Sequence, residues 1–84
     1  MSTTSNTENN RRDFGPQPLA AILQGLGLRN HDVVVASTEQ LTHKMVAKAC
    51  RGRRLSNNVR GKILRALNKA SGQNYAQSDL FNYS

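Results

Sequence analysis

Apolar residues in the first third of the chain recur with the period of an α-helix. Four of them stand at i, i+3, i+4 and i+7 and so share one face: Leu19, Ile22, Leu23 and Leu26. Pro18 suits a first helical turn, and Gly27 suits the end of a helix. The pattern predicts a helix that begins at Pro18 and stops near Leu26–Leu28.

The next apolar run, Val33–Ala36, fits two structures. Its three valines favour a strand by propensity, whereas Asn30 as an N-cap and Asp32 in the first turn favour a short helix. No second strand-like segment exists to pair with it, and an isolated strand is unstable. We therefore predict a short helix.

Ser37 and Gln40 stand at the spacing of a capping box, which predicts a third helix that runs from there to about Cys50. Its apolar arc holds Leu41, Met45, Val46 and Ala49. The opposite arc holds Lys44, Ala47, Lys48 and Arg51, with His43 beside them. The helix is amphipathic, and the charges on its polar face are all positive.

A longer helix follows a break at Gly52. Ser56 or Asn57 caps it, and Ser71-Gly72 ends it after about Ala70. Its apolar stripe consists of Val59, Ile63, Ala66, Leu67 and Ala70. A second basic row lies beside that stripe: Lys62, Arg65 and Lys69.

The two ends of the chain differ in character. Residues 1–15 are rich in Ser, Thr and Asn and predict a disordered polar tail. The segment after Gly72 carries three of the four aromatic residues, so it either folds back onto the helices or forms a homodimer surface, with Ser78 as a candidate cap for a short turn. We predict an all-α fold, a bundle of four to five short helices over residues 16–84.

Composition narrows the class of protein. The single cysteine, Cys50, excludes an internal disulfide and a cysteine-rich zinc site, and His31 and His43 stand far apart in sequence without further ligands. No apolar run is long enough to span a membrane, and the N-terminus lacks a signal-peptide core. We expect a cytoplasmic chain with no cofactor, no metal and no membrane partner.

The net charge of +7 is concentrated in one region. Leu41–Ala70 holds nine cations and no acid, which leaves −2 for the rest of the chain. Solvated helix faces usually mix signs because i, i+4 ion pairs support a helix, whereas an acid-free pair of helices repels itself. We therefore predict that this region binds phosphates.

Catalytic chemistry has little support in the sequence. The five acids are scattered at positions 8, 13, 32, 39 and 79. Cys50 has basic neighbours, Lys48 and Arg51, but it lies at the edge of an apolar face, so we interpret it as a small buried hydrophobe. We predict that the chain is not an enzyme.

The basic region contains no aromatic residue, and single-strand binding needs aromatic stacking platforms, so the sequence favours a duplex. On the polar arc of the predicted third helix, Lys44 and Lys48 are long enough to reach guanine acceptors, and the methyl group of Ala47 suits contact with a thymine methyl.

The order of certain residues resembles the helix-turn-helix of phage repressors and Cro-like regulators: Val35-Ala36, Leu41, Val46, Ala49 and Gly52. The following residues are similar to the segment after the recognition helix in lactose-repressor-type headpieces: Arg53-Arg54-Leu55-Ser56, Val59-Arg60, Ile63-Leu64 and Ala66. The resemblance covers about Leu19 to Gly72. The chain departs from the family at the tight turn, where Gln40 stands in place of glycine.

The resemblance implies that His31 and Asp32 begin the positioning helix of a helix-turn-helix. It places five residues on the recognition helix: Thr42, His43, Lys44, Ala47 and Lys48. It places Arg51, Arg53 and Arg54 along a phosphate strand. Lys62, from the second basic row, completes the predicted nucleic-acid-binding set.

We hypothesise a DNA-binding protein, either a small transcriptional regulator or a nucleoid-associated factor, with double-stranded DNA as its partner. One alternative is an RNA-binding or ribosome-associated basic helical module. Another is an interaction domain that docks an acidic protein.

Overall fold

The computed structural model describes residues 14–83, and helices form their regular structure without a β-strand. The helices are α2 (Pro18–Leu26), α3 (Asn30–Ala36), α4 (His43–Arg51), α5 (Asn57–Ser71) and α6 (Gln77–Leu80). The all-α prediction is confirmed, and the valine run is helical. No helix among the described residues is long and apolar enough to cross a membrane.

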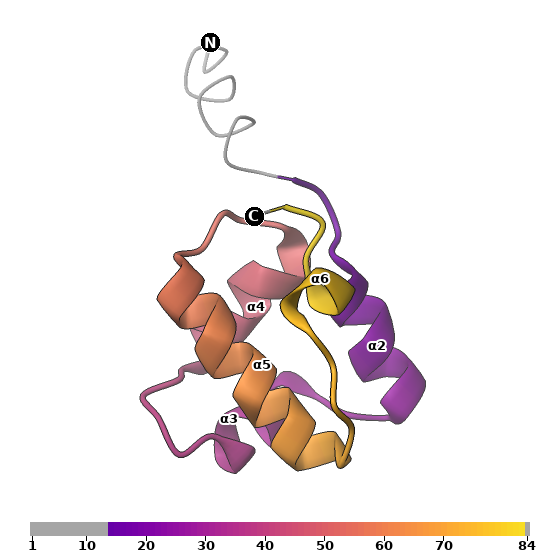
Figure 1. Cartoon of the computed structure of the whole chain (residues 1–84), viewed down its shortest axis with the longest axis vertical. Coiled ribbons are helices and arrows are strands. Elements are labelled where there is room, and N and C mark those ends of the chain that lie inside the picture. The colour runs from indigo at the N-terminus through magenta and orange to yellow at the C-terminus, as the bar shows by residue number, and fades with distance from the viewer. Residues whose placement is uncertain (1–13, 84) are drawn as a thin grey trace, which may run out of the picture.

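Helix α5 is the longest element and crosses the molecule diagonally (Figure 1). Helix α3 packs against both α5 and α4, while α2 contacts α4 and α6. The short α6 returns from the end of α5 and lies beside α2, so the segments that precede α2 and follow α6 lie close together (Figure 1).

Two predicted helix ends match the structure closely. Gly27 ends α2 with a left-handed backbone, φ 72°. Ser56 caps α5, where its Oγ accepts the Val59 N–H at 3.2 Å. Because such caps are local hydrogen bonds and backbone preferences, they could be predicted from the sequence.

The predicted start of α4 at Ser37 is wrong. The helix begins at His43, and Thr42 is its N-cap because its Oγ1 accepts the Met45 N–H at 3.1 Å. Ser37 Oγ instead accepts the Glu39 N–H at 3.0 Å and closes a local turn. Residues 37–42 therefore form a connection outside the helix.

In α3 and α6 the start shifts relative to the prediction. Arg29, not Asn30, precedes α3, and Ala76, not Ser78, precedes α6. In both helices an aspartate three residues further on accepts the backbone N–H of the cap residue at 2.8 Å, Asp32 in one and Asp79 in the other. These carboxylates set the helix starts.

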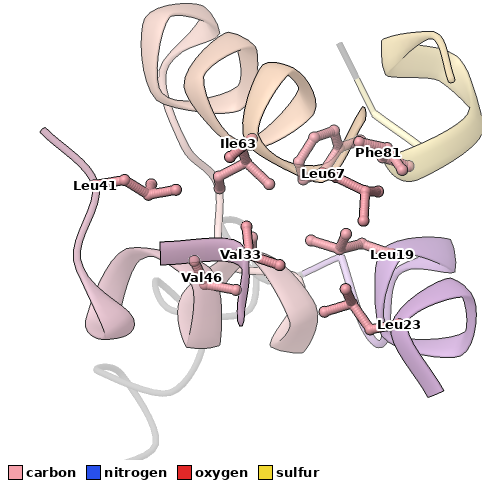
Figure 2. Packing of buried hydrophobic residues seen from close by; sticks show 11 residues of the cluster. Leu19, Leu23, Val33, Leu41, Val46, Ile63, Leu67 and Phe81 are labelled. Carbon is pink, nitrogen blue, oxygen red and sulfur yellow. The ribbon is translucent and has the colours of Figure 1, made fainter. Parts of the chain in front are cut away.

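The core is mostly aliphatic, with one aromatic member, and draws on every described helix (Figure 2). Its buried members are Leu19, Leu23, Val33, Leu41, Val46, Ala49, Ile63, Ala66, Leu67, Leu80 and Phe81. The last two show that the aromatic segment folds back onto the helices, which was one of its two predicted arrangements.

Within the described residues, Phe14, which the sequence assigned to the polar tail, already packs against the helices. Phe14 N–H donates to the Gly52 carbonyl at 2.8 Å. Gln17, which is 2% exposed, donates to the Gly15 carbonyl at 2.8 Å and accepts the Asn82 N–H at 2.8 Å. This buried amide links the segments before α2 and after α6. The rest of the predicted tail, residues 1–13, lies outside the described residues.

Candidate nucleic-acid interface

Helix α4 presents most of the predicted contact residues on one face. Positions 43, 44, 47, 48 and 51 share this face because they are spaced by one helical turn. His43, Lys44 and Arg51 are exposed, whereas Ala47 and Lys48 are partly buried. Thr42 is also exposed, and its hydroxyl is engaged as the helix cap.

The loop after α4 carries two more exposed cations, Arg53 and Arg54. The Tyr83 hydroxyl holds this loop: it accepts the Leu55 N–H at 3.1 Å and donates to the Arg53 carbonyl at 3.2 Å. The Arg54 guanidinium lies 5.9 Å from the centre of the Phe14 ring. The loop backbone is therefore fixed while its basic side chains face outward.

The cations of α5 are used differently. Arg65 makes a bidentate ion pair with Glu39 at 2.7 and 2.8 Å, and Lys62 Nζ donates to the Gln40 carbonyl at 3.3 Å. The hydrogen bonds and charge of Arg65, with a smaller contribution from the charge of Lys62, hold the pKa of the Glu39 carboxyl below its ordinary value. The same hydrogen bonds raise the pKa of Arg65.

Glu39 partly neutralises the basic region that the sequence predicted to be free of acids. The basic region is acid-free in sequence, but the fold brings in this carboxylate from 26 residues away. The predicted second basic row is thus partly neutralised, and Lys62 is tied to the connection before α4. Lys69 remains exposed at the far end of α5.

Five cations remain without an ion-pair partner on α4 and its following loop, within residues 14–83: Lys44, Lys48, Arg51, Arg53 and Arg54. We call this set the α4 basic face.

Two aromatic residues from outside the basic region lie beside its loop in the structure. Phe14 and Tyr83, distant in sequence, stack at 4.4 Å between ring centres beside the basic loop. The Arg60 guanidinium lies 4.9 Å from the centre of the Tyr83 ring, and Arg54 lies over Phe14. Both rings are already engaged by each other and by arginine, so they do not offer open platforms for bases.

A histidine pair joins the starts of α3 and α4. His31 Nδ1 and His43 Nε2 lie 3.0 Å apart. The ring centres are 5.3 Å apart and the ring planes differ by 12°, so the rings meet edge to edge in nearly one plane. One nitrogen donates to the other in this arrangement. No sequence pattern predicted this contact, because the two histidines stand 12 positions apart on different helices.

Cys50 lies in the partly buried position expected of a small hydrophobe. Its Sγ is 4.0 Å from Asn30 Oδ1, and burial raises the pKa of the thiol. A raised pKa disfavours the thiolate. Among the described residues, no group of three or more His, Cys, Asp or Glu side chains is arranged to hold a metal ion.

Helices α3 and α4 pack together in the order expected of a helix-turn-helix, but the connection between them spans residues 37–42. This connection is longer than the three- to four-residue turn typical of the motif. Comparison of the chain with protein-family models, curated proteins and solved structures found no match.

Proposed function

We propose that the protein binds double-stranded DNA through the α4 basic face, with α4 entering the major groove. The observation that carries the proposal is the segregation of charge. The cations of α4 and its loop lie together with no acidic partners within the described part of the chain. On α5, by contrast, Arg65 is paired with Glu39, Lys62 bonds to a backbone carbonyl and Arg60 is buried, which leaves Lys69 as the exposed cation without a partner among the described residues. Keeping five like charges together costs stability unless a polyanion neutralises them.

The dimensions of α4 support a duplex. An α-helix with its side chains is about 10–12 Å across, and the major groove of a DNA duplex, about 12 Å wide, admits one. In this arrangement Lys44 and Lys48 face base edges, and Arg51, Arg53 and Arg54 follow one phosphate strand. Thr42 and His43 lie at the end of α4 that enters first, and Ala47 offers a methyl group between the two lysines.

Fluorescence anisotropy with labelled duplex DNA, structured RNA and poly-glutamate at several salt concentrations tests the proposal. With Arg51, Arg53 and Arg54 on phosphates, the log–log salt slope for duplex DNA is about −2.7, and phosphate contacts by both lysines as well would make it about −4.5. Tighter binding to RNA than to any duplex would favour the RNA-binding alternative, and tighter binding to poly-glutamate would favour the acidic-protein alternative.

A matched pair of variants locates the surface. Arg53→Ala removes an exposed cation of the α4 basic face, and Lys69→Ala removes one from the far end of α5. Arg53→Ala should weaken binding to all duplexes alike and reduce the slope by about 0.9. Lys69→Ala should leave affinity nearly unchanged, and equal effects from the two variants would argue against a localised face.

Base reading is tested separately from phosphate binding. Lys44→Ala and Lys48→Ala should reduce the preference for a selected sequence over a random one if these residues read bases. A uniform loss on all sequences would assign both lysines to phosphates instead. The preferred sequence for this comparison comes from selection on a randomised duplex library.

A further inference from the structure

Arg60 is a buried cation that DNA binding does not use. Its side chain lies on α5 on the inner side of the C-terminal segment, and the residue is 8% exposed. No carboxylate of the described residues pairs with it. Its guanidinium lies near two aromatic rings, at 4.9 Å from the centre of Tyr83 and 6.0 Å from the centre of Phe81.

The hydrogen-bonding capacity of this guanidinium is largely unfilled. Nη1 donates to the Tyr83 carbonyl at 3.2 Å, whereas the enclosed Nε has no partner. Buried polar groups are nearly always hydrogen-bonded, and a buried charge without a counter-ion is costly. Cation–π contacts offset only part of that cost.

Beside Arg60 lies an open hollow of about 490 Å³. Its lining residues are Arg60, Gln77, Ser78, Phe81, Asn82 and Tyr83. The lining combines aromatic rings with amide and hydroxyl groups and includes no acid. Asp79, the acid of α6, is outside this lining and accepts the Ala76 N–H instead. The volume is within the range of small-molecule sites, roughly 300–1,000 Å³.

We propose that the hollow binds a small organic anion, a carboxylate or a phosphate monoester, whose charged group pairs with Arg60. The anion supplies the missing counter-charge, and arginine presents several donors to such a group. Phe81 and Tyr83 form the apolar part of the lining beside the organic body of the ligand, while Gln77, Ser78 and Asn82 supply polar contacts. The hollow shares no residue with the α4 basic face, although Tyr83 also bonds to the loop that carries Arg53, and the proposal does not depend on DNA binding.

An NMR titration of the full ¹⁵N-labelled chain tests the site. The probes are benzoate, phenyl phosphate and inorganic phosphate, each added at constant ionic strength. Saturable shifts of the Arg60 Nε–H signal and of the Gln77 and Asn82 side-chain amides are expected, and the probe that saturates first identifies the anion class. Saturation with none of the three, or shifts that sodium chloride reproduces, would overturn the proposal.

A carboxylate built into the lining provides a second test that keeps the fold. Gln77→Glu places an isosteric acid in the hollow, where it should pair with Arg60, raise the Tm by several degrees and abolish the saturable shifts. Gln73→Glu makes the same charge change at an exposed position outside the hollow. It should leave benzoate and phenyl phosphate binding intact. Equal Tm changes in the two variants, with binding retained in Gln77→Glu, would contradict the assignment.

Discussion

Gly52 and Gly72 both end a helix in the left-handed region, with φ of 91° and 71°, but their surroundings differ. A Cβ on Gly72 would meet open space, whereas a Cβ on Gly52 would overlap the backbone of Gly15. Glycine at position 72 is thus favoured by conformation alone. At position 52 it is also required by the close approach of the segment before α2.

This difference predicts unequal costs for the same substitution. Gly72→Ala should lower the free energy of unfolding by about 1–2 kcal/mol, the cost of a left-handed alanine. Gly52→Ala should cost clearly more, because Gly15 and the Phe14 hydrogen bond must shift as well. Urea unfolding of both variants measures the difference. Equal losses would show that the segment before α2 moves away freely.

Glu39 and Arg65 give stability a specific dependence on pH. The pKa of Glu39 is lowered from an ordinary value of 4.5 in the folded chain, so the pair stabilises the fold above that pH. The contribution is lost as the pH falls through the lowered pKa. The wild type should therefore unfold at higher urea than Glu39→Gln at pH 7, and the two midpoints should converge as the pH falls below 4.5 and the carboxyl becomes protonated. A difference that stays constant with pH would exclude the ion pair as its source.

At the scale of elements, what the sequence predicted depended on how local each signal was. The end of α2 and the span of α5 follow from Gly27, Ser56 and Gly72, because a cap involves only neighbouring residues. The start of α4 could not be chosen the same way. Both Ser37 and Thr42 are good cap residues. Thr42 is the cap in the structure because Leu41, which is 7% exposed, packs into the core from the connection before the helix.

In the candidate site, too, the sequence predicted the local features and missed the contacts between distant residues. Helical spacing correctly placed His43, Lys44 and Arg51 on an exposed face of α4. It could not foresee the ion pair that Glu39 makes across 26 residues, nor the stacking of Phe14 on Tyr83. Those contacts exist because α5 packs beside the connection before α4 and the C-terminal segment returns to Phe14, and periodicity carries no information about such returns.

The histidine pair is the polar link between the starts of α3 and α4, and a double-mutant cycle measures it. His31→Ala and His43→Ala should each lower stability, and the double variant should lose less than the sum, by about 0.5–1 kcal/mol. Chemical denaturation of the four proteins in one buffer supplies the four values. Additive losses would show that the 3.0 Å contact contributes nothing to holding the two helices together.

For the whole molecule, the segments before α2 and after α6 are held together over the α4–α5 loop. Gln17 joins Gly15 to Asn82, and Phe14 stacks on Tyr83. Through its hydroxyl, Tyr83 also fixes Leu55 and Arg53 in that loop. The basic loop is thus supported by residues from both ends of the described chain, which explains how a loop rich in arginine keeps a defined backbone.

Tyr83→Phe tests this support, because it removes one oxygen and keeps the ring that stacks on Phe14. The Leu55 N–H then loses its acceptor, which should cost about 1–2 kcal/mol and lower the Tm by roughly 5–10 °C. Hydrogen exchange at the Leu55 amide should accelerate more than exchange in the core of α5. Tyr75→Phe is the matched control, since Tyr75 bonds to Asn68 through its backbone and not its hydroxyl. Unchanged exchange at Leu55 would mean that the loop holds its shape without the C-terminal segment, and the arginines would then owe their placement to α4 and α5 alone.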